Sequence, residues 1–273
     1  MHGPARMNPR HRLQLAGGLL ALLVVSAVVG PLLYAVDPDV LDFARAAAPP
    51  GTGHPLGTDE NGRDVLARLL VGGRVSLATG AAAMLLAACL GTATGALAAL
   101  SGRRVDALLM RLTDAALAVP TIFIVITVVT FFGPSVPTLI VTIGATSWMG
   151  LARLVRGELL ALREQSFVEG AIALGAPPLE RARRHLLPHL WPTILVNATL
   201  GMGSALLIES ALSFLGLGVQ PPAASWGNML SGSQSSLYTA PWLAVFPGAM
   251  ILLAVVSINL LGDALRDTLH PAE

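Results

Sequence analysis

The sequence has no lysine, one cysteine and few charged or aromatic residues. All seventeen basic residues among its 273 positions are arginine, and 12% of the chain is charged. A phosphate-binding loop that ends in Gly-Lys-Ser or Gly-Lys-Thr needs a lysine, so the chain is not itself an ATPase of that class. The lone Cys89 excludes an intrachain disulfide and a metal site built on thiolates. A net charge of +1 gives no field that would attract nucleic acid.

Long uncharged runs dominate the rest of the chain. Hydrophobic residues make up 54% of it, and the mean hydropathy is +0.70. About 20 apolar residues in a helix cross the hydrocarbon of a bilayer. The sequence therefore predicts an all-α polytopic membrane protein with six spans, which run over Leu15–Val36, Val75–Leu100, Ala115–Phe132, Val136–Val155, Trp191–Leu215 and Pro241–Gly262. A cleaved secretory signal is the less favoured reading of the first run, because its apolar stretch is long and no convincing cleavage site follows.

The distribution of arginine predicts the orientation of the spans. Positively charged flanks stay in the cytoplasm. Arginines precede span 1, lie between spans 2 and 3, and follow spans 4 and 6, whereas the loops after spans 3 and 5 carry no charge. Both termini are therefore expected in the cytoplasm. In the second span, Gly91 and Gly95 form a GxxxG spacing, which predicts either close packing against another helix or plain apolar filler.

About 35 residues separate spans 4 and 5, more than a turn requires. Their composition predicts a helix over Gly157–Leu174, a C-terminal cap at Gly175, and a second helix over Leu179–Leu187 that starts after Pro178. A group of arginines on the second helix would suit contact with anionic lipid, but a docking element for another protein is the alternative.

This loop contains EGAIALG, APPLERARR and HLLP in succession. It resembles the cytoplasmic loop of binding-protein-dependent ABC importer permeases, in which E-A-A is followed by three residues, G, nine residues, I, one residue and L-P. The residues that match are Glu169, Ala171, Gly175, Leu187 and Pro188. Gly170 and His185 depart from the pattern. A histidine followed by an aliphatic residue and L-P, as at His185, resembles the dipeptide, oligopeptide and nickel branch of the family.

Three other stretches are similar to the same branch, and specifically to the C-type permease of its subunit pair. They begin at His54, Ala211 and Pro241. The first contains a GTDxxGRD motif with Gly57, Thr58, Asp59, Gly62, Arg63 and Asp64. An ordinary turn, with Asp59 or Asp64 capping the next helix, would explain the same residues. The external stretch with Gln220, Trp226 and Asn228 would suit a binding protein or be a connecting loop.

The resemblance implies a type I permease fold in a bacterial inner membrane. Its partners would be a homologous second permease, two ATPase subunits and an external solute-binding protein, and ATP and Mg²⁺ would be bound by the ATPases. The chain itself would hold no cofactor or metal and catalyse no reaction. Residues 1–74 would form an anchor helix with an external segment, and residues 75–273 a five-helix core that contains the coupling loop, 157–190. The cargo would be a di- or oligopeptide, or alternatively nickel.

Glu209 is the one acidic residue inside a predicted span. A carboxylate in hydrocarbon is costly unless it is paired, protonated or faces a cavity. It would either line the translocation path or its outer gate, or pair with a neighbouring helix. A self-contained secondary transporter or a channel is the rival class, but it would call for more intramembrane charge and for inverted repeats.

Overall fold

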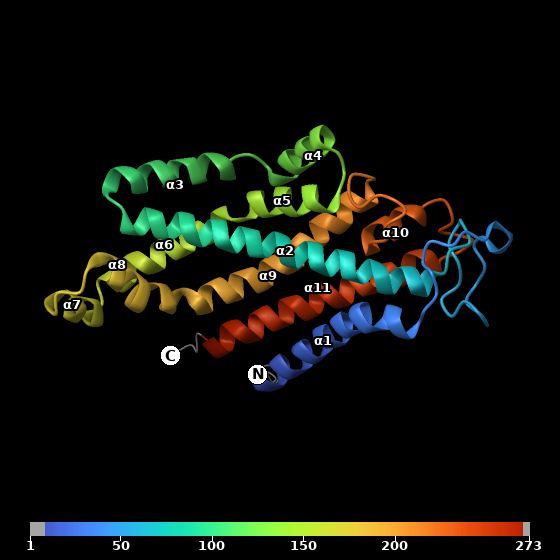
Figure 1. The fold of residues 1–273 in the computed structure, drawn as a ribbon, viewed down its shortest axis with the longest axis horizontal. Coiled ribbons are helices and arrows are strands. Elements are labelled where there is room, and N and C mark those ends of the chain that lie inside the picture. Colours follow the sequence, from blue (N-terminus) through green and yellow to red (C-terminus); the bar gives the residue numbers. More distant parts are fainter. Residues whose placement is uncertain (1–8, 270–273) are drawn as a thin grey trace, which may run out of the picture.

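The long apolar runs form helices that lie side by side along one axis (Figure 1). The structure is a computed structural model and describes residues 9–269. Its α-helices are α1 (Pro9–Leu33), α2 (Val65–Leu100), α3 (Arg103–Leu117), α4 (Thr121–Phe132), α5 (Val136–Ser147), α6 (Met149–Arg163), α7 (Ser166–Ala173), α8 (Pro178–Glu180), α9 (Trp191–Phe214), α10 (Trp226–Gly232) and α11 (Trp242–Leu269). Within residues 9–269 the only β structure is two isolated bridges, so the all-α prediction is confirmed.

Two of the six predicted spans are broken helices. The first part of the third span belongs to α3, which begins at Arg103 and is followed by α4 after a bend of 81°. Pro120 lies directly before α4, and proline disfavours a helical conformation in the residue before it. The fourth span bends by 40° at Trp148, between α5 and α6. Four further helices are long and apolar enough to cross a membrane without a break. With each bent pair counted as one span, the total is six, as predicted.

The second span is longer than predicted because α2 begins at Val65, not Val75. Its 36 residues correspond to about 54 Å of helix, well beyond about 30 Å of hydrocarbon. The predicted boundary at residue 74 therefore falls inside this helix. The arginines at its start, which hydropathy places outside a span, have partners: Arg74 donates to the carbonyls of Ala27 and Val28 at 2.7 and 2.6 Å.

Helix α2 is the centre of the bundle and contacts α1, α5, α6 and α9. Its GxxxG face packs on α6. A Cβ at Gly91 would lie 2.8 Å from the carbonyl oxygen of Trp148, and a Cβ at Gly95 would lie 2.4 Å from that of Ala152. The packing interpretation of these glycines is confirmed, because the two backbones approach too closely for a larger residue.

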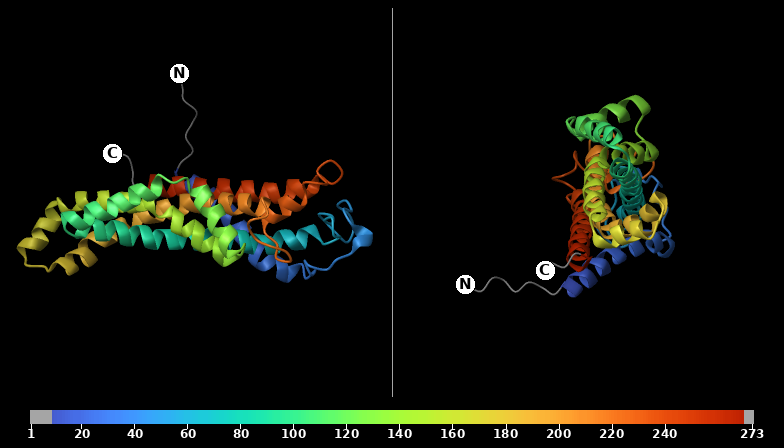
Figure 2. Two further views of the ribbon diagram at one scale, coloured as in Figure 1. Left: turned by 90° about the horizontal axis from the view of Figure 1, so that it is seen from above. Right: turned by 90° about the vertical axis from the view of Figure 1, so that its left-hand side faces the viewer.

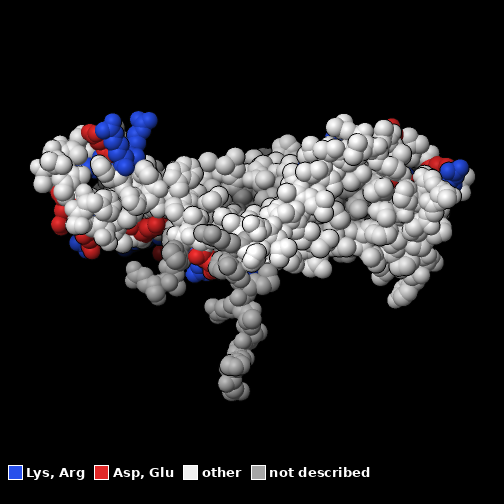
Figure 3. All heavy atoms as spheres, turned by 90° about the horizontal axis from the view of Figure 1, so that it is seen from below, with Lys and Arg blue, Asp and Glu red and all other residues white. Residues whose placement is uncertain are grey.

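Charged side chains gather toward the two ends of the elongated molecule, and a band of uncharged residues lies between them (Figure 3). One end carries α7 and α8, and the other carries residues 37–64 and α10 (Figures 1 and 2). The charged helix α3 is compatible with the bundle because Arg153 and Arg156 of α6 pair with Asp114 and Asp106 of α3. The described part of the chain begins in α1 and ends in α11, which lie against each other.

Candidate functional site

Helices α7 and α8 form the end of the molecule beyond α6 and α9 (Figure 1). The predicted helix over 157–174 is wrong in its extent, because α6 continues to Arg163 and α7 starts at Ser166. The Arg163 guanidinium donates to the carbonyl of Ala99 at 2.7 Å and so attaches the end of α6 to the end of α2. Gln165 is extended, with ψ 146°, and the chain turns there before α7. A tertiary contact thus sets where the loop leaves the bundle.

Gly175 ends α7 as the sequence predicted. Its φ is +77°, its N–H donates to Ile172 at 2.9 Å, and the Ala176 N–H donates to Ala171 at 3.0 Å. These two bonds form a Schellman cap, in which a left-handed residue satisfies the last carbonyls of a helix. An added Cβ at Gly175 would meet nothing within 4 Å, so the requirement for glycine here comes from the backbone alone.

The residues of the loop motif differ in how exposed they are. Val168 and Ala171 form the buried side of α7, and Glu169 and Gly170 point away from it and are exposed. Phe167 of α7 stacks on His189, with ring centroids 5.1 Å apart, so the two halves of the loop are in contact. Within the motif, Gly175 and Pro188 are exposed and His185 and Leu187 are half-buried.

The second half of the loop is continuous with the following span. After α8, a π-helical turn (Arg181–Leu186) and a 3₁₀ turn (Leu187–Leu190) lead directly into α9. Proline lacks an N–H, and changes between i→i+5 and i→i+3 bonding accommodate it without ending the helical path. The predicted helix over 179–187 is therefore confirmed, but it is the beginning of a longer rod that joins the loop to the membrane.

At the other end of the molecule, the GTDxxGRD residues form one turn. Thr58 is fully buried; its hydroxyl donates to the carbonyl of Arg45 and accepts from the Ala48 N–H. The Asp59 carboxylate accepts from the Asn61 and Arg63 N–H groups at 2.9 and 3.0 Å, and from the Arg63 side chain at 2.7 Å.

Gly62 and Gly57 of the same turn have φ of +77° and +80°. A Cβ on Gly62 would lie 1.8 Å from the carbonyl oxygen of Asp42, so both the conformation and the space require glycine.

Asp64 ends this turn and starts α2. One carboxylate oxygen accepts from the Ala67 N–H at 2.8 Å, which confirms the N-cap interpretation. The other lies 2.7 Å from His54 Nδ1 and accepts from the Tyr34 hydroxyl at 2.9 Å. Burial and the hydrogen bond to Asp64 raise the pKa of Tyr34 to about 12, so its hydroxyl stays a donor at neutral pH. One carboxylate thus connects the end of α1, the segment over residues 37–64 and the start of α2.

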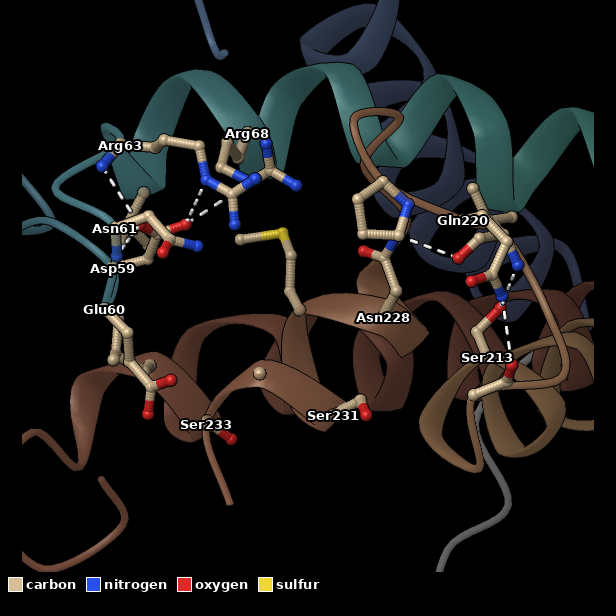
Figure 4. Close-up of a pocket in the computed structure, with 17 residues that line it drawn as sticks. Asp59, Glu60, Asn61, Arg63, Arg68, Ser213, Gln220, Asn228, Ser231 and Ser233 are labelled. Atoms are coloured by element: carbon tan, nitrogen blue, oxygen red, sulfur yellow. Dashed lines mark hydrogen bonds and ion pairs between the residues drawn. The ribbon is translucent and has the colours of Figure 1, made fainter. Parts of the chain in front are cut away.

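A cavity of about 330 Å³ opens beside this turn (Figure 4). Asp59 and Arg63 line one side, and Gln220 and Asn228 line the other. Arg68, only 3% exposed, also lines it and lies 3.0 Å from Asp39 and 3.7 Å from Asp59. The GTDxxGRD turn and the stretch after α9 therefore form one site.

Trp226 is not part of that surface. Its side chain is 1% exposed, and its ring N–H donates to the carbonyl of Leu69 at 3.0 Å. The prediction that placed it among external contact residues is wrong, because the indole fills the space between α10 and α2. The side chain of Asn228 forms hydrogen bonds within its own loop. Its amide group donates to the carbonyls of Val219 and Ala223, and its oxygen accepts from the Ser225 N–H.

Glu209 lies in α9, near its C-terminal end, and has no exposed surface. Its carboxylate accepts hydrogen bonds from Ser213 at 2.8 Å, from Ser76 of α2 at 3.1 Å and, more weakly, from Ser210 at 3.4 Å. Ser76 also accepts from the Trp226 N–H at 3.2 Å, so the network extends to α10. Within the subunit this acid is enclosed by hydroxyl groups that connect α2, α9 and α10.

The chain matches known proteins over most of its length. Residues 91–272 match the family described as "Binding-protein-dependent transport system inner membrane component". The chain belongs to this family. Over 257 residues the permease is 38% identical to the oligopeptide transport system permease protein OppC of Haemophilus influenzae, which covers 93% of this chain and 83% of that one. It is 38% identical to OppC of Escherichia coli K12, with 93% and 85% coverage. It is 40% identical to a putative peptide permease of Brucella suis, with 93% and 84% coverage.

The fold of the permease is that of an ABC importer. It matches a chain of the MetNI methionine ABC transporter in an inward-facing conformation, with a TM-score of 0.57 and 19% identity, over 74% of this chain and 95% of that one. Family membership excludes the alternative of an unrelated secondary transporter or channel. The permease is a multi-pass inner-membrane protein, as predicted.

The sequence interpretation missed the hydroxyl partners of Glu209. Ser213 lies four residues after it on one helix face, a spacing that could have indicated the contact. Ser76 is 133 positions away and carried no such signal.

Proposed function

We propose that this permease carries oligopeptides into the cell as one of two permease subunits of an ATP-driven importer. Oligopeptide is preferred over nickel because the relatives above are named as peptide permeases. The permease would pair with a homologous subunit, and the peptide would pass between the two. ATP and Mg²⁺ would be bound by two partner ATPases, and the permease itself would contribute no catalysis.

The observation that supports this proposal is the geometry of the loop between α6 and α9. Helix α7 presents Glu169 to solvent, and its exposed neighbours Ile172 and Leu174 give the same end an apolar surface. This combination suits a groove on an ATPase subunit that would pair with Glu169 and cover the leucine. Both termini and this loop would lie in the cytoplasm, in agreement with the arginine distribution.

Movement of the docked loop would reach the membrane through two helices. On one side α6 leads into the loop, and on the other α8 continues through the π and 3₁₀ turns into α9. A rigid rod transmits a tilt better than a flexible linker. Closure of the ATPases would therefore change the angle of α9 and expose the path to one side or the other.

The opposite end would receive the peptide-loaded binding protein. The cavity between the GTDxxGRD turn and the stretch after α9 carries paired charges on a rigid framework. Such a surface favours a polar, specific and reversible contact over a permanent one.

Substitution of Glu169 tests the coupling role. In the complete transporter reconstituted in liposomes, Glu169→Ala should lower ATP hydrolysis stimulated by the binding protein roughly tenfold, because a charged hydrogen bond across the docking surface is lost. Glu164→Ala, at an exposed carboxylate of the same loop, is the matched control and should leave the stimulation unchanged. Unchanged stimulation in the Glu169 variant would refute the docking assignment.

A further inference from the structure

A second cavity of about 370 Å³ lies in the membrane part of the bundle, among α2, α5, α6 and α9. On α9 it is lined by Asn197, Gly201 and Ser204, a spacing that places all three on one helix face. Gly201 is ten residues from the start of α9 and thirteen from its end, or roughly 15 and 20 Å along the axis. The cavity is therefore near the middle of the membrane.

The break between α5 and α6 borders this cavity. Ser147 precedes the 40° bend at Trp148, Gly150 follows it, and both line the cavity. Irregular backbone at membrane depth occurs where protein covers it or where it borders a cavity that can hold water or solute. Discontinuous helices near the midplane are typical of substrate sites in transporters.

The polar groups of the cavity are available for a ligand. The Asn197 amide donates to the carbonyl of Thr193 at 2.9 Å. Among residues 9–269, the structure shows no hydrogen-bond partner for the oxygen of Asn197 or for the hydroxyls of Ser147 and Ser204. Gly150 and Ser204 are exposed on the surface of the subunit, so the cavity is open from outside the chain. Polar groups in hydrocarbon are costly without partners, and a polar solute would supply them.

We infer that this cavity is the site at which the permease contacts the backbone of a peptide in transit; the inference rests on the proposed function. A peptide needs donors and acceptors for its amide groups in a medium that provides few. Asn and Ser supply both. No described residue that lines the cavity is charged, and several are small, so side chains of different kinds can be accommodated. Its volume is at the lower end of the range for small-molecule sites, and the second permease would complete it.

Protection of an introduced cysteine tests this assignment in the complete transporter. Cys89 is the only cysteine of the chain, so Cys89→Ala gives a background free of reactive thiols in this subunit. In that background, Ser204→Cys should react with a cationic methanethiosulfonate, and trialanine delivered by the binding protein should slow the reaction at least threefold. Leu195→Cys is the control, because nine residues place it on the opposite side of α9, where it is exposed. Trialanine should not alter its reaction.

Two further variants separate contact from coupling. Asn197→Ala should lower trialanine uptake about five- to tenfold, the effect of one lost hydrogen bond to the peptide, and retain stimulated ATP hydrolysis. Gly150→Leu should fill the cavity without a clash, because a Cβ there meets nothing within 4 Å, and should block uptake. Gly18→Leu, at an equally open glycine of α1, should not.

The outcomes distinguish the two proposals. If trialanine is transported but leaves the Ser204→Cys reaction unchanged, the cavity assignment is wrong and the function stands. If the cysteine reacts in the isolated subunit and is blocked in the assembly with or without peptide, the partner permease fills the cavity and the assignment is again wrong. If the unmodified transporter binds and hydrolyses ATP normally but carries no peptide, both the cargo and the peptide site are overturned.

Discussion

Substitution of Glu209 tests whether its carboxylate holds α2, α9 and α10 together. The carboxylate has two close hydroxyl donors, Ser213 at 2.8 Å and Ser76 at 3.1 Å, and no exposed surface. Glu209→Gln keeps one acceptor oxygen, and serine hydroxyls can turn to accept from the new amide. The expected loss is about 1–2 kcal/mol, which is less than two bonds to a charged group would contribute.

Glu209→Lys removes both acceptor oxygens and places a cation where serine hydroxyls are the neighbours and the structure shows no carboxylate to pair with it among residues 9–269. A buried charge without a partner costs about 3–5 kcal/mol. For a chain of this size, 1 kcal/mol corresponds to about 2–4 °C in the melting temperature. We therefore expect Tm to fall by roughly 2–8 °C for Gln and by more than 6 °C for Lys, with loss of the assembled complex in the second case.

The assay is thermal unfolding of the purified assembly in detergent, followed by size-exclusion chromatography, with peptide uptake measured in parallel. Glu164→Lys, at an exposed carboxylate, is the control and should change Tm by less than about 2 °C. Near-normal Tm and uptake in both Glu209 variants would refute any packing or path role. A Gln variant with normal Tm and no uptake would instead place the carboxylate in the transport mechanism.

The GTDxxGRD turn and the α2–α6 contact give three further predictions. Gly62→Ala should lower the free energy of unfolding by at least about 2 kcal/mol, because the strain of a left-handed backbone adds to the clash with a backbone oxygen. Gly53→Ala, at a glycine with φ +100° but open space around it, should lower the free energy of unfolding by less. Thermal unfolding compares the two variants. Gly95→Val should separate α2 from α6 by pressing on the Ala152 carbonyl, and a normal yield of folded protein in detergent would contradict this. Asp64→Ala should cost about 1–2 kcal/mol through the lost helix cap alone, whereas Asp64→Asn, which can still accept that bond, should cost less in the same measurement.

Local features of the chain were readable from sequence because their causes are local. Hydropathy and arginine placement depend on each segment and its flanks, and they gave the six spans. Gly175 and Pro178 marked the end of α7 and the start of α8, since backbone conformation and the absence of an N–H belong to single residues. Asp64 indicated the start of a helix for the same reason.

Where helices end and what a buried group contacts were decided by tertiary structure. Hydropathy placed the start of the second span at Val75. The helix extends to Val65, because Arg74 has partners in α1 and Arg68 has a partner in the segment over residues 37–64. The bend at Trp148 could not be predicted from the sequence, because neither Trp148 nor its two chain neighbours is a proline or a glycine.

The role of each polar residue depended on distant positions in the same way. The sequence alone determined that Glu209 needs a partner in the membrane, because the cost of a carboxylate in hydrocarbon is independent of fold. The contact between Ser76 and Glu209 and the burial of Trp226 could be seen only in the tertiary structure. A residue's chemistry is local, whereas its neighbours are set by the packing of helices that are far apart along the chain.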